Sequence, residues 1–250
     1  MPRLTDKSMQ VASIRGMQAF KFSATKVEKL GATEYTLATV AVDVTGSVSG
    51  FEAELKKCLK TAIASLKKSP RSDNMLVRVI LFSTAFAGGI EEIHGFKPLT
   101  EIDPDSYPDL YPGGGTPLYD ACFSALGATN TYAKQLMDQD FLVNGIVVVV
   151  TDGDDNASSA TTKMLRKEMD RGRQGEEIES LIGIAVGINA QNFRPRLELL
   201  ESEAGMQYID AGDATASKLA KLANFISQSV SSQSQSLGTG GPSQNIAATI

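Results

Sequence analysis

The sequence predicts an α/β protein in which helices cover both faces of a largely parallel sheet. From residue 35 onward, apolar runs with strong strand preference alternate with longer segments that have the period of a helix. The chain has 250 residues, of which 42% are apolar and 21% charged. This length and composition are sufficient for a soluble domain with a sizeable core.

Five apolar runs are expected to form strands, and the most hydrophobic of them should lie near the centre of the sheet. They are residues 35–44, 75–83, 145–153, 181–188 and 206–210. The stretch from Phe86 to Ile93 follows a strand directly and opens with alanine and two glycines. It is the candidate for a short antiparallel edge strand.

Helices are expected between these strands. Residues 51–68 carry large apolar side chains three and four positions apart, which is typical of an amphipathic helix lying on a sheet. Similar patterns predict helices over residues 117–137, 159–171, 191–203 and 214–229.

The two ends of the chain differ in composition from the middle. Residues 1–34 are an N-terminal extension, in which residues 18–30 alternate enough to form an extra edge strand and the first dozen or so should be poorly ordered. Residues 229–250 are rich in Ser, Gln and Gly, which predicts a flexible tail. The organised domain is therefore expected over residues 35–228.

Charge and hydropathy favour some classes of partner and argue against others. The net charge is −5, and the basic residues are scattered rather than gathered with aromatic ones, so we expect no nucleic-acid partner. No run approaches the roughly 20 apolar residues of a membrane helix, and no secretion signal is evident. We expect a cytoplasmic protein with no membrane partner. Cys58 and Cys122 lie far apart and should be buried free thiols.

Three segments gather polar side chains where a strand or loop meets the next helix. The first contains Asp43, Thr45 and Ser47, the second contains Thr116, and the third contains Asp152. Residues at the carboxyl ends of parallel strands can converge on one point. Carboxylates and hydroxyls without His or Cys suit a hard divalent cation such as Mg²⁺ or Mn²⁺.

In their order and spacing, these segments resemble the metal-ion-dependent adhesion site of the von Willebrand factor type A (vWA) domain. The residues that carry the resemblance are Asp43-x-Thr45-x-Ser47, Thr116 in GGGTPL and Asp152 in VVVVTDG. The resemblance spans about residues 35–228 and implies a Rossmann-like, doubly wound, mostly parallel sheet with one short antiparallel edge strand. A Mg²⁺ or Mn²⁺ would lie at the top of that sheet.

The resemblance also implies a role for each residue. Thr45, Ser47 and Thr116 would supply hydroxyl oxygens, while Asp43 and Asp152 would bind the ion directly or through water. Thr45 stands where Ser is usual in the family; its methyl group stiffens the side chain but leaves the hydroxyl available.

The function that the resemblance implies is metal-dependent protein binding. In this family a Glu or Asp side chain of a bound protein typically completes the ion's shell, and an ion that retains positive charge favours such a carboxylate. We therefore expect an assembly or regulatory subunit and not an enzyme.

Taken singly, the same residues have simpler interpretations. Asp43 or Asp152 followed by a glycine-containing turn fits an ordinary turn or helix cap. Ser47 fits an N-cap, and Thr116 before proline fits the first turn of a helix. A structural domain with a degenerate metal site is therefore one alternative.

A second alternative is a Mg²⁺-dependent phosphohydrolase of the haloacid dehalogenase type, with Asp43 as its nucleophile. Such enzymes have a second Asp two residues later, where this chain has Thr45, and this counts against an enzyme. Asp154 and Asp155 are expected in a solvated loop outside the site. His94, the one histidine, is expected at the surface, and no nucleophile motif accompanies it.

Overall fold

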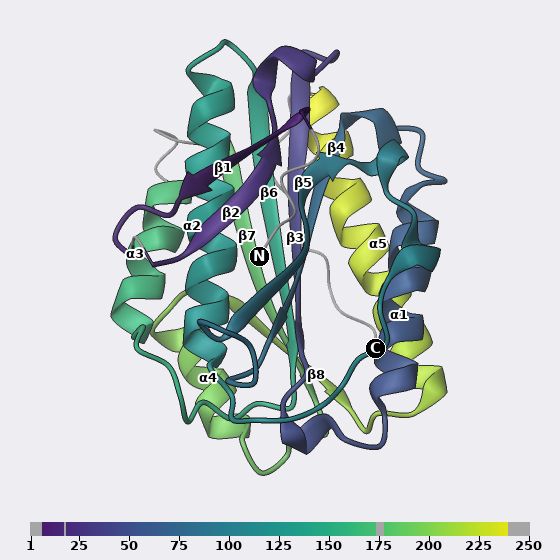
Figure 1. Ribbon diagram of the computed structural model, residues 1–250, viewed down its shortest axis with the longest axis vertical. Coiled ribbons are helices and arrows are strands. Elements are labelled where there is room, and N and C mark those ends of the chain that lie inside the picture. The colour runs from purple at the N-terminus through teal and green to yellow at the C-terminus, as the bar shows by residue number, and fades with distance from the viewer. Residues whose placement is uncertain (1–6, 18, 174–177, 240–250) are drawn as a thin grey trace.

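The computed structural model describes residues 7–17, 19–173 and 178–239. Over these residues one mixed sheet separates two layers of helices (Figure 1). The strands are β1 (Met9–Ser13), β2 (Lys21–Thr25), β3 (Glu34–Asp43), β4 (Met75–Phe82), β5 (Ile90–Pro98), β6 (Leu142–Thr151), β7 (Ser180–Ile188) and β8 (Gln207–Gly212). Their order across the sheet is β1-β2-β5-β4-β3-β6-β7-β8.

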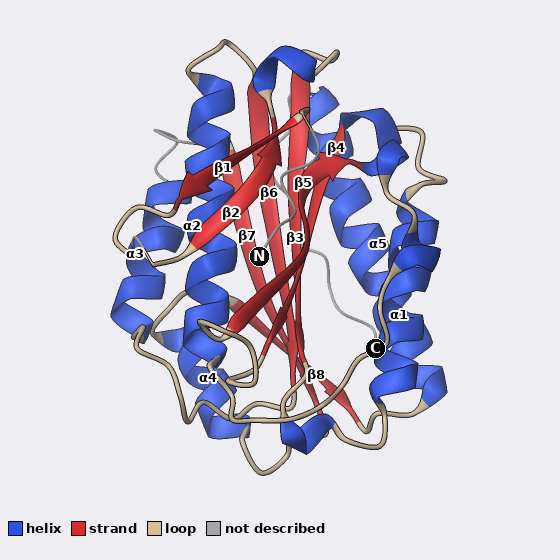
Figure 2. Ribbon diagram, in the orientation of Figure 1, coloured by secondary structure: helices blue, strands red, loops and turns tan. Residues whose placement is uncertain are grey.

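The helices cover both faces of this sheet, as Figure 2 shows in blue. They are α1 (Glu52–Leu66), α2 (Leu118–Met137), α3 (Thr162–Arg173), α4 (Arg194–Ser202) and α5 (Ala216–Thr239). Short 3₁₀ helices lie at Val27–Lys29, Gly46–Val48, Ser72–Asn74, Leu99–Glu101 and Pro104–Ser106. Helices α2, α3 and α4 contribute to the core on one face, and α1 and α5 to the core on the other.

The predicted fold class is confirmed. β3 lies at the centre and pairs in parallel with both β4 and β6, and β7 and β8 continue the parallel arrangement. The valine run of β6 shows why these strands are continuously apolar. Val147 and Val149 enter the core beneath α2, while Val148 and Val150 enter the core beneath α1 and α5. Both faces of the strand are buried, because successive side chains point to opposite sides.

The antiparallel part of the sheet is larger than predicted. β5 pairs antiparallel with β4, but it starts at Ile90 because Gly88 and Gly89, both with positive φ, form the preceding turn. β5 is also not the outermost strand, since β2 pairs with it in parallel and β1 pairs antiparallel with β2. The extra strand expected within residues 18–30 is therefore β2, while β1 lies in the stretch expected to be poorly ordered.

The last helix is longer than predicted. α5 continues beyond the expected start of the tail, so residues 229–239 are helical; residues 240–250 lie outside the described residues. Composition misled the prediction because several Ser and Gln side chains of this stretch, such as Ser229 and Ser234, are buried against the protein. Val230 and Gln233 are buried, and the amide nitrogen of Asn144 donates to the carbonyl oxygen of Gln233 at 2.7 Å.

Three smaller predictions can also be compared with the structure. Cys58 and Cys122 are buried and free, as expected. His94 is half-buried rather than at the surface, because the segment after β5 folds back over it, and its Nε2 lies 2.8 Å from the hydroxyl of Tyr107. Burial lowers the pKa of His94 to about 4. Within the described ranges, no helix is long and apolar enough to cross a membrane.

Candidate metal centre

The three predicted polar segments meet at the carboxyl end of the parallel strands. β3 ends at Asp43, and its neighbour β6 ends at Thr151, directly before Asp152. The segment that leads into α2 crosses this end of the sheet (Figure 1) and brings Thr116 with it. The structure therefore places all five predicted ligands at one end of the sheet.

Asp43 is buried and fully engaged with the protein. Its Oδ1 accepts a hydrogen bond from the backbone nitrogen of Thr45 at 2.9 Å, and its Oδ2 accepts one from the hydroxyl of Thr151 at 2.7 Å. Burial raises the pKa of Asp43 to about 6, although these hydrogen bonds oppose the shift; the neighbouring charge of Asp152 contributes to it. Asp43 thus fixes the turn that follows β3.

The hydroxyls of that turn point toward one another. Thr45 Oγ1 and Ser47 Oγ lie 3.0 Å apart, with Thr45 buried and Ser47 exposed at the opening of the Gly46–Val48 turn. Ser47 also hydrogen-bonds to Asp152, which lowers the pKa of that carboxyl, while burial raises it by more. Thr45, Ser47 and Asp152 therefore form one connected group of oxygens.

Asp152 supplies the observation that distinguishes this group from an ordinary turn. Its side chain is 5% exposed, and its Oδ1 is buried without a hydrogen-bond partner. A buried carboxylate oxygen left without a partner costs free energy, and such atoms are rare in native proteins. A divalent cation would satisfy this oxygen, and the hydroxyls beside it are ligands that Mg²⁺ and Mn²⁺ accept. The residues present therefore fit such an ion.

The glycine-rich segment before α2 is bonded to the turn after β3. The backbone nitrogen of Gly46 donates to the oxygen of Gly114 at 3.1 Å, and that of Gly113 donates to the oxygen of Val44 at 3.0 Å. Gly114 has a φ of +74°, and a Cβ there would lie 2.7 Å from Thr84 Oγ1. Glycine is therefore required at this position, because a side chain would collide with the loop that follows β4.

Thr116 is held by the third segment. Its backbone nitrogen donates to Asn156 Oδ1 at 2.8 Å, and the backbone nitrogen of Asn156 donates to the Thr116 oxygen at 3.1 Å. These two bonds connect the loop that precedes α2 to the loop that follows β6. Asn156 thus fixes the position of Thr116 relative to Asp152.

Sequence reasoning missed several residues that shape this centre. Thr151 stands in the predicted segment, but its bond to Asp43 could be seen only once β3 and β6 were paired. Asn156 carried no usable signal, because it acts through a contact with a residue far away in the chain. Asp155 was expected in a solvated loop, but it is half-buried: its Oδ1 accepts from the backbone nitrogen of Tyr119 at 3.2 Å and so caps α2.

The set of ligands carries little charge. Among the described residues, no group of three or more His, Cys, Asp or Glu side chains could hold a metal. The candidate centre has two carboxylates, and hydroxyls make up the rest. An ion bound there would keep much of its positive charge.

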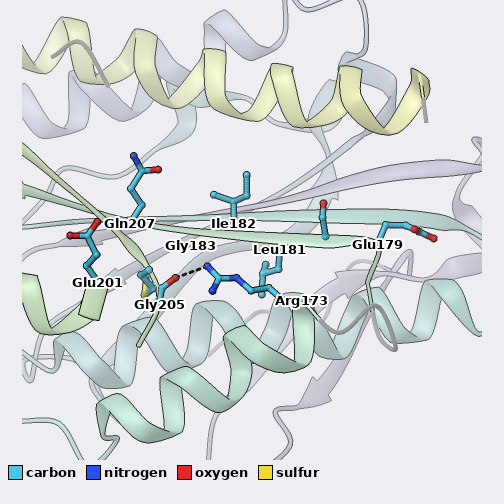
Figure 3. Close-up of a pocket in the computed structure, with 10 residues that line it drawn as sticks. Arg173, Glu179, Leu181, Ile182, Gly183, Glu201, Gly205 and Gln207 are labelled. Carbon is cyan, nitrogen blue, oxygen red and sulfur yellow. Dashed lines mark hydrogen bonds between the residues drawn. The ribbon is translucent and has the colours of Figure 1, made fainter. Parts of the chain in front are cut away.

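A cavity lies elsewhere and shares no residue with this centre. It has a volume of about 620 Å³ and opens beside the first residues of β7, at the opposite end of that strand (Figure 3). Arg173 crosses its wall and donates to the oxygen of Gly205 at 2.7 Å. Glu179 and Glu201 also line it, together with apolar side chains such as Ile182. This mixture does not present a converging set of metal ligands.

Solved structures of other proteins share this fold. No protein-family model and no curated protein sequence match the chain. A solved structure of the pilus adhesin SpaC from Lactobacillus rhamnosus GG matches 90% of this chain with a TM-score of 0.58 and 12% identity. The PilB minor pilin from Streptococcus sanguinis matches 91% of it with a TM-score of 0.55 and 14% identity.

Proximal thread matrix protein 1 (PTMP1) from the mussel byssus matches 80% of this chain, with a TM-score of 0.55 and 18% identity. Another structure of PTMP1 has a zinc occupied MIDAS motif and matches 80% of this chain, with a TM-score of 0.50 and 13% identity. The fold is vWA-like. This chain spans only 34% of SpaC, 68% of PilB and 48% of PTMP1, and the low identities establish the fold alone.

Proposed function

We propose that this chain is a metal-dependent protein-binding module, in which Asp43, Thr45, Ser47, Thr116 and Asp152 hold a Mg²⁺ or Mn²⁺. The observation that carries the proposal is the buried, unpartnered Oδ1 of Asp152 beside the hydroxyl of Ser47. The shared fold, and the zinc occupied MIDAS motif in the structure of PTMP1, support a divalent ion at this place.

The hydrogen bonds of these residues indicate which of them would bind the ion directly and which would position the others. Asp152 has a carboxylate oxygen with no protein partner and is the direct ligand of the set. Both oxygens of Asp43 already accept hydrogen bonds, so this residue orients Thr45 and supplies negative charge. Thr116 is presented by its backbone bonds to Asn156. The bound ion would offer a positive charge to a partner's Glu or Asp carboxylate.

A role in binding is also supported by the solved structures compared above, which are of pilus proteins and a matrix protein. The phosphohydrolase alternative needs a second carboxylate near Asp43. At that position Thr45 lies with its hydroxyl 3.0 Å from Ser47, a geometry that suits a ligand cluster and offers no general acid. The protein partner and the cytoplasmic location remain predictions.

The test is calorimetric titration of Mn²⁺ and Mg²⁺ into chelator-treated protein. We expect about one ion bound per chain, with affinity lost in Asp152→Asn. Asp154→Asn is the matched control, because Asp154 lies in the same loop and its carboxylate accepts protein hydrogen bonds. It should keep most of the affinity.

Two results would contradict this proposal and favour one of the alternatives. If the parent protein binds neither ion, the site is a degenerate scaffold. If the protein releases phosphate from a phosphoester in Mg²⁺ and Asp43→Asn stops the release, the phosphohydrolase alternative is correct.

A further inference from the structure

Tyr111 is the most exposed of the three large hydrophobic side chains found at the surface of the described residues. It is 80% exposed, compared with 50% for Leu142 and 39% for Val11. A single exposed aromatic residue is common on protein surfaces, so exposure alone carries no inference. The position of Tyr111 and the way its loop is fixed give the exposure a meaning.

Tyr111 lies beside the candidate metal centre. Two residues further along, the backbone nitrogen of Gly113 donates to the oxygen of Val44, which follows Asp43 directly. Two residues of extended chain span about 7 Å, so the Cα of Tyr111 lies at the rim of the site. Leu142 begins β6 and therefore stands at the opposite end of the sheet.

The loop that carries Tyr111 is anchored on both sides. Before it, Leu110 is buried in the core beneath α1 and α5, and Asp109 is paired with Lys56 at 2.8 Å. After it, Pro112 restricts the backbone, and Gly113 is bonded to Val44. The fixed neighbours prevent Tyr111 from turning into the core, so the loop holds the ring in solvent.

An aromatic side chain exposed on an anchored loop is well suited to be an anchor in protein recognition. Tyr contributes a large contact area, loses little conformational entropy on binding, and is enriched at the residues that dominate interface energetics. Here the ring would lie next to an ion that attracts a partner's carboxylate. The two contacts are complementary, because the ion supplies electrostatic attraction and the ring supplies buried apolar area.

We propose that Tyr111 is the second anchor of the partner-binding surface, and that the partner is a protein loop whose acidic side chain reaches the metal while an apolar side chain next to it packs on the Tyr111 ring. This inference rests on the proposed function, because the acidic side chain requires a bound ion. It goes further by defining the partner as a loop with paired acidic and apolar residues.

The probe for this proposal is a phage-displayed library of short disulfide-closed loops with a central Glu and random residues elsewhere. The library is selected on the parent protein in Mn²⁺ and eluted with a chelator. We expect the eluted loops to be enriched in apolar residues beside the Glu. Their affinity should fall roughly tenfold or more in Tyr111→Ala. Tyr111→Phe, which keeps the ring, should retain most of it.

The matched control is Leu142→Ala, which removes an exposed apolar side chain at the other end of the sheet and should leave loop binding unchanged. Mn²⁺ affinity, measured by calorimetry without any loop, should be the same in Tyr111→Ala as in the parent. A loss of Mn²⁺ affinity in Tyr111→Ala would overturn the proposal, because Tyr111 would then support the metal site itself.

Two further outcomes would also overturn it: loops that bind Tyr111→Ala as tightly as the parent, or no chelator-eluted loops from a protein that binds Mn²⁺. If the parent does not bind Mn²⁺, the proposed function fails together with this inference, and calorimetry alone reveals that case.

Discussion

Two buried charged clusters in the same sheet differ in whether their hydrogen bonds are complete. In the first, Arg78 of β4 is fully buried and pairs with Glu92 of β5, with Nε and Oε2 2.7 Å apart. The other oxygen of Glu92 accepts from the backbone nitrogen and hydroxyl of Ser23, and Arg78 also donates to Ser124. This cluster has opposite charges and joins β2, β4, β5 and α2.

The candidate metal centre has the reverse properties. Asp43 and Asp152 both have a raised pKa, chiefly because they are buried, and the negative charge of Asp152 adds to the cost of ionising Asp43. One oxygen of Asp152 has no partner. The comparison shows how a structural cluster differs from a ligand site: the first satisfies itself, whereas the second is completed by something that is not part of the chain.

The largest expected loss of stability follows from breaking the pair of Arg78 and Glu92. Glu92→Ala leaves the Arg78 guanidinium buried without its counter-charge, and we expect a loss of about 3–5 kcal/mol in the free energy of unfolding. Urea denaturation measures it. The double variant Arg78→Met with Glu92→Leu removes both charges and should recover much of the loss. A Glu92→Ala protein within about 1 kcal/mol of the parent would contradict the importance given to this pair.

The stability of the protein should depend on pH through the carboxyl of Asp43. Burial raises the folded-state pKa of Asp43 from 3.8 to about 6. The folded protein therefore binds the proton more tightly, and this contribution to stability is lost as the pH rises from about 4 to 6. It amounts to at most about 3 kcal/mol.

His94 acts in the opposite direction over a similar range. Its pKa is lowered from 6.5 to about 4, so its contribution to stability rises with pH. The two effects are separated by comparing the chelator-treated parent with Asp43→Asn. As the pH rises from 4 to 6, the free energy of unfolding of the parent should fall relative to that of Asp43→Asn. A difference that does not vary with pH would show that the carboxyl of Asp43 titrates normally.

A smaller effect, on the affinity for Mn²⁺, is expected from changing Asn156, which positions Thr116. Asn156→Ala removes the acceptor for the backbone nitrogen of Thr116, and we expect roughly a tenfold loss of Mn²⁺ affinity. Calorimetry measures the affinity, and thermal unfolding in chelator checks that the fold is retained. Unchanged affinity would mean that Thr116 is placed well enough by its other contacts.

The smallest change in stability is expected for Asp152→Asn in metal-free protein. The variant removes a like charge from the vicinity of Asp43 and leaves the surrounding backbone bonds in place. The free energy of unfolding should change by less than about 1 kcal/mol, in contrast to Glu92→Ala. A loss as large as that of Glu92→Ala would identify Asp152 as a folding residue.

The sequence was sufficient to predict the parallel core, because burial on both faces demands apolar residues that are visible in the chain itself. β3, β4, β6, β7 and β8 all lie close to their predicted ranges. Composition failed for residues 229–239, where several Ser and Gln side chains are buried and the hydroxyl of Ser234 accepts a hydrogen bond from Arg71. Composition measures hydrophobicity and does not register such contacts.

The candidate ligands were predicted because they stand at strand ends, where parallel topology brings them together. The roles of Thr151 and Asn156 depend on contacts between distant segments, and so does the partial burial of His94 by the loop that carries Tyr107. The exposure of Tyr111 depends on how its loop is anchored. These features follow from the fold and are not written in any local pattern.

The most direct test of the metal centre is anomalous diffraction from crystals of the protein soaked in Mn²⁺. The account predicts one strong manganese peak within bonding distance of Asp152 Oδ1 and Ser47 Oγ, absent in crystals of Asp152→Asn. A peak only at other carboxylates, or no peak beside Asp152 in crystals where the site is open to solvent, would contradict it.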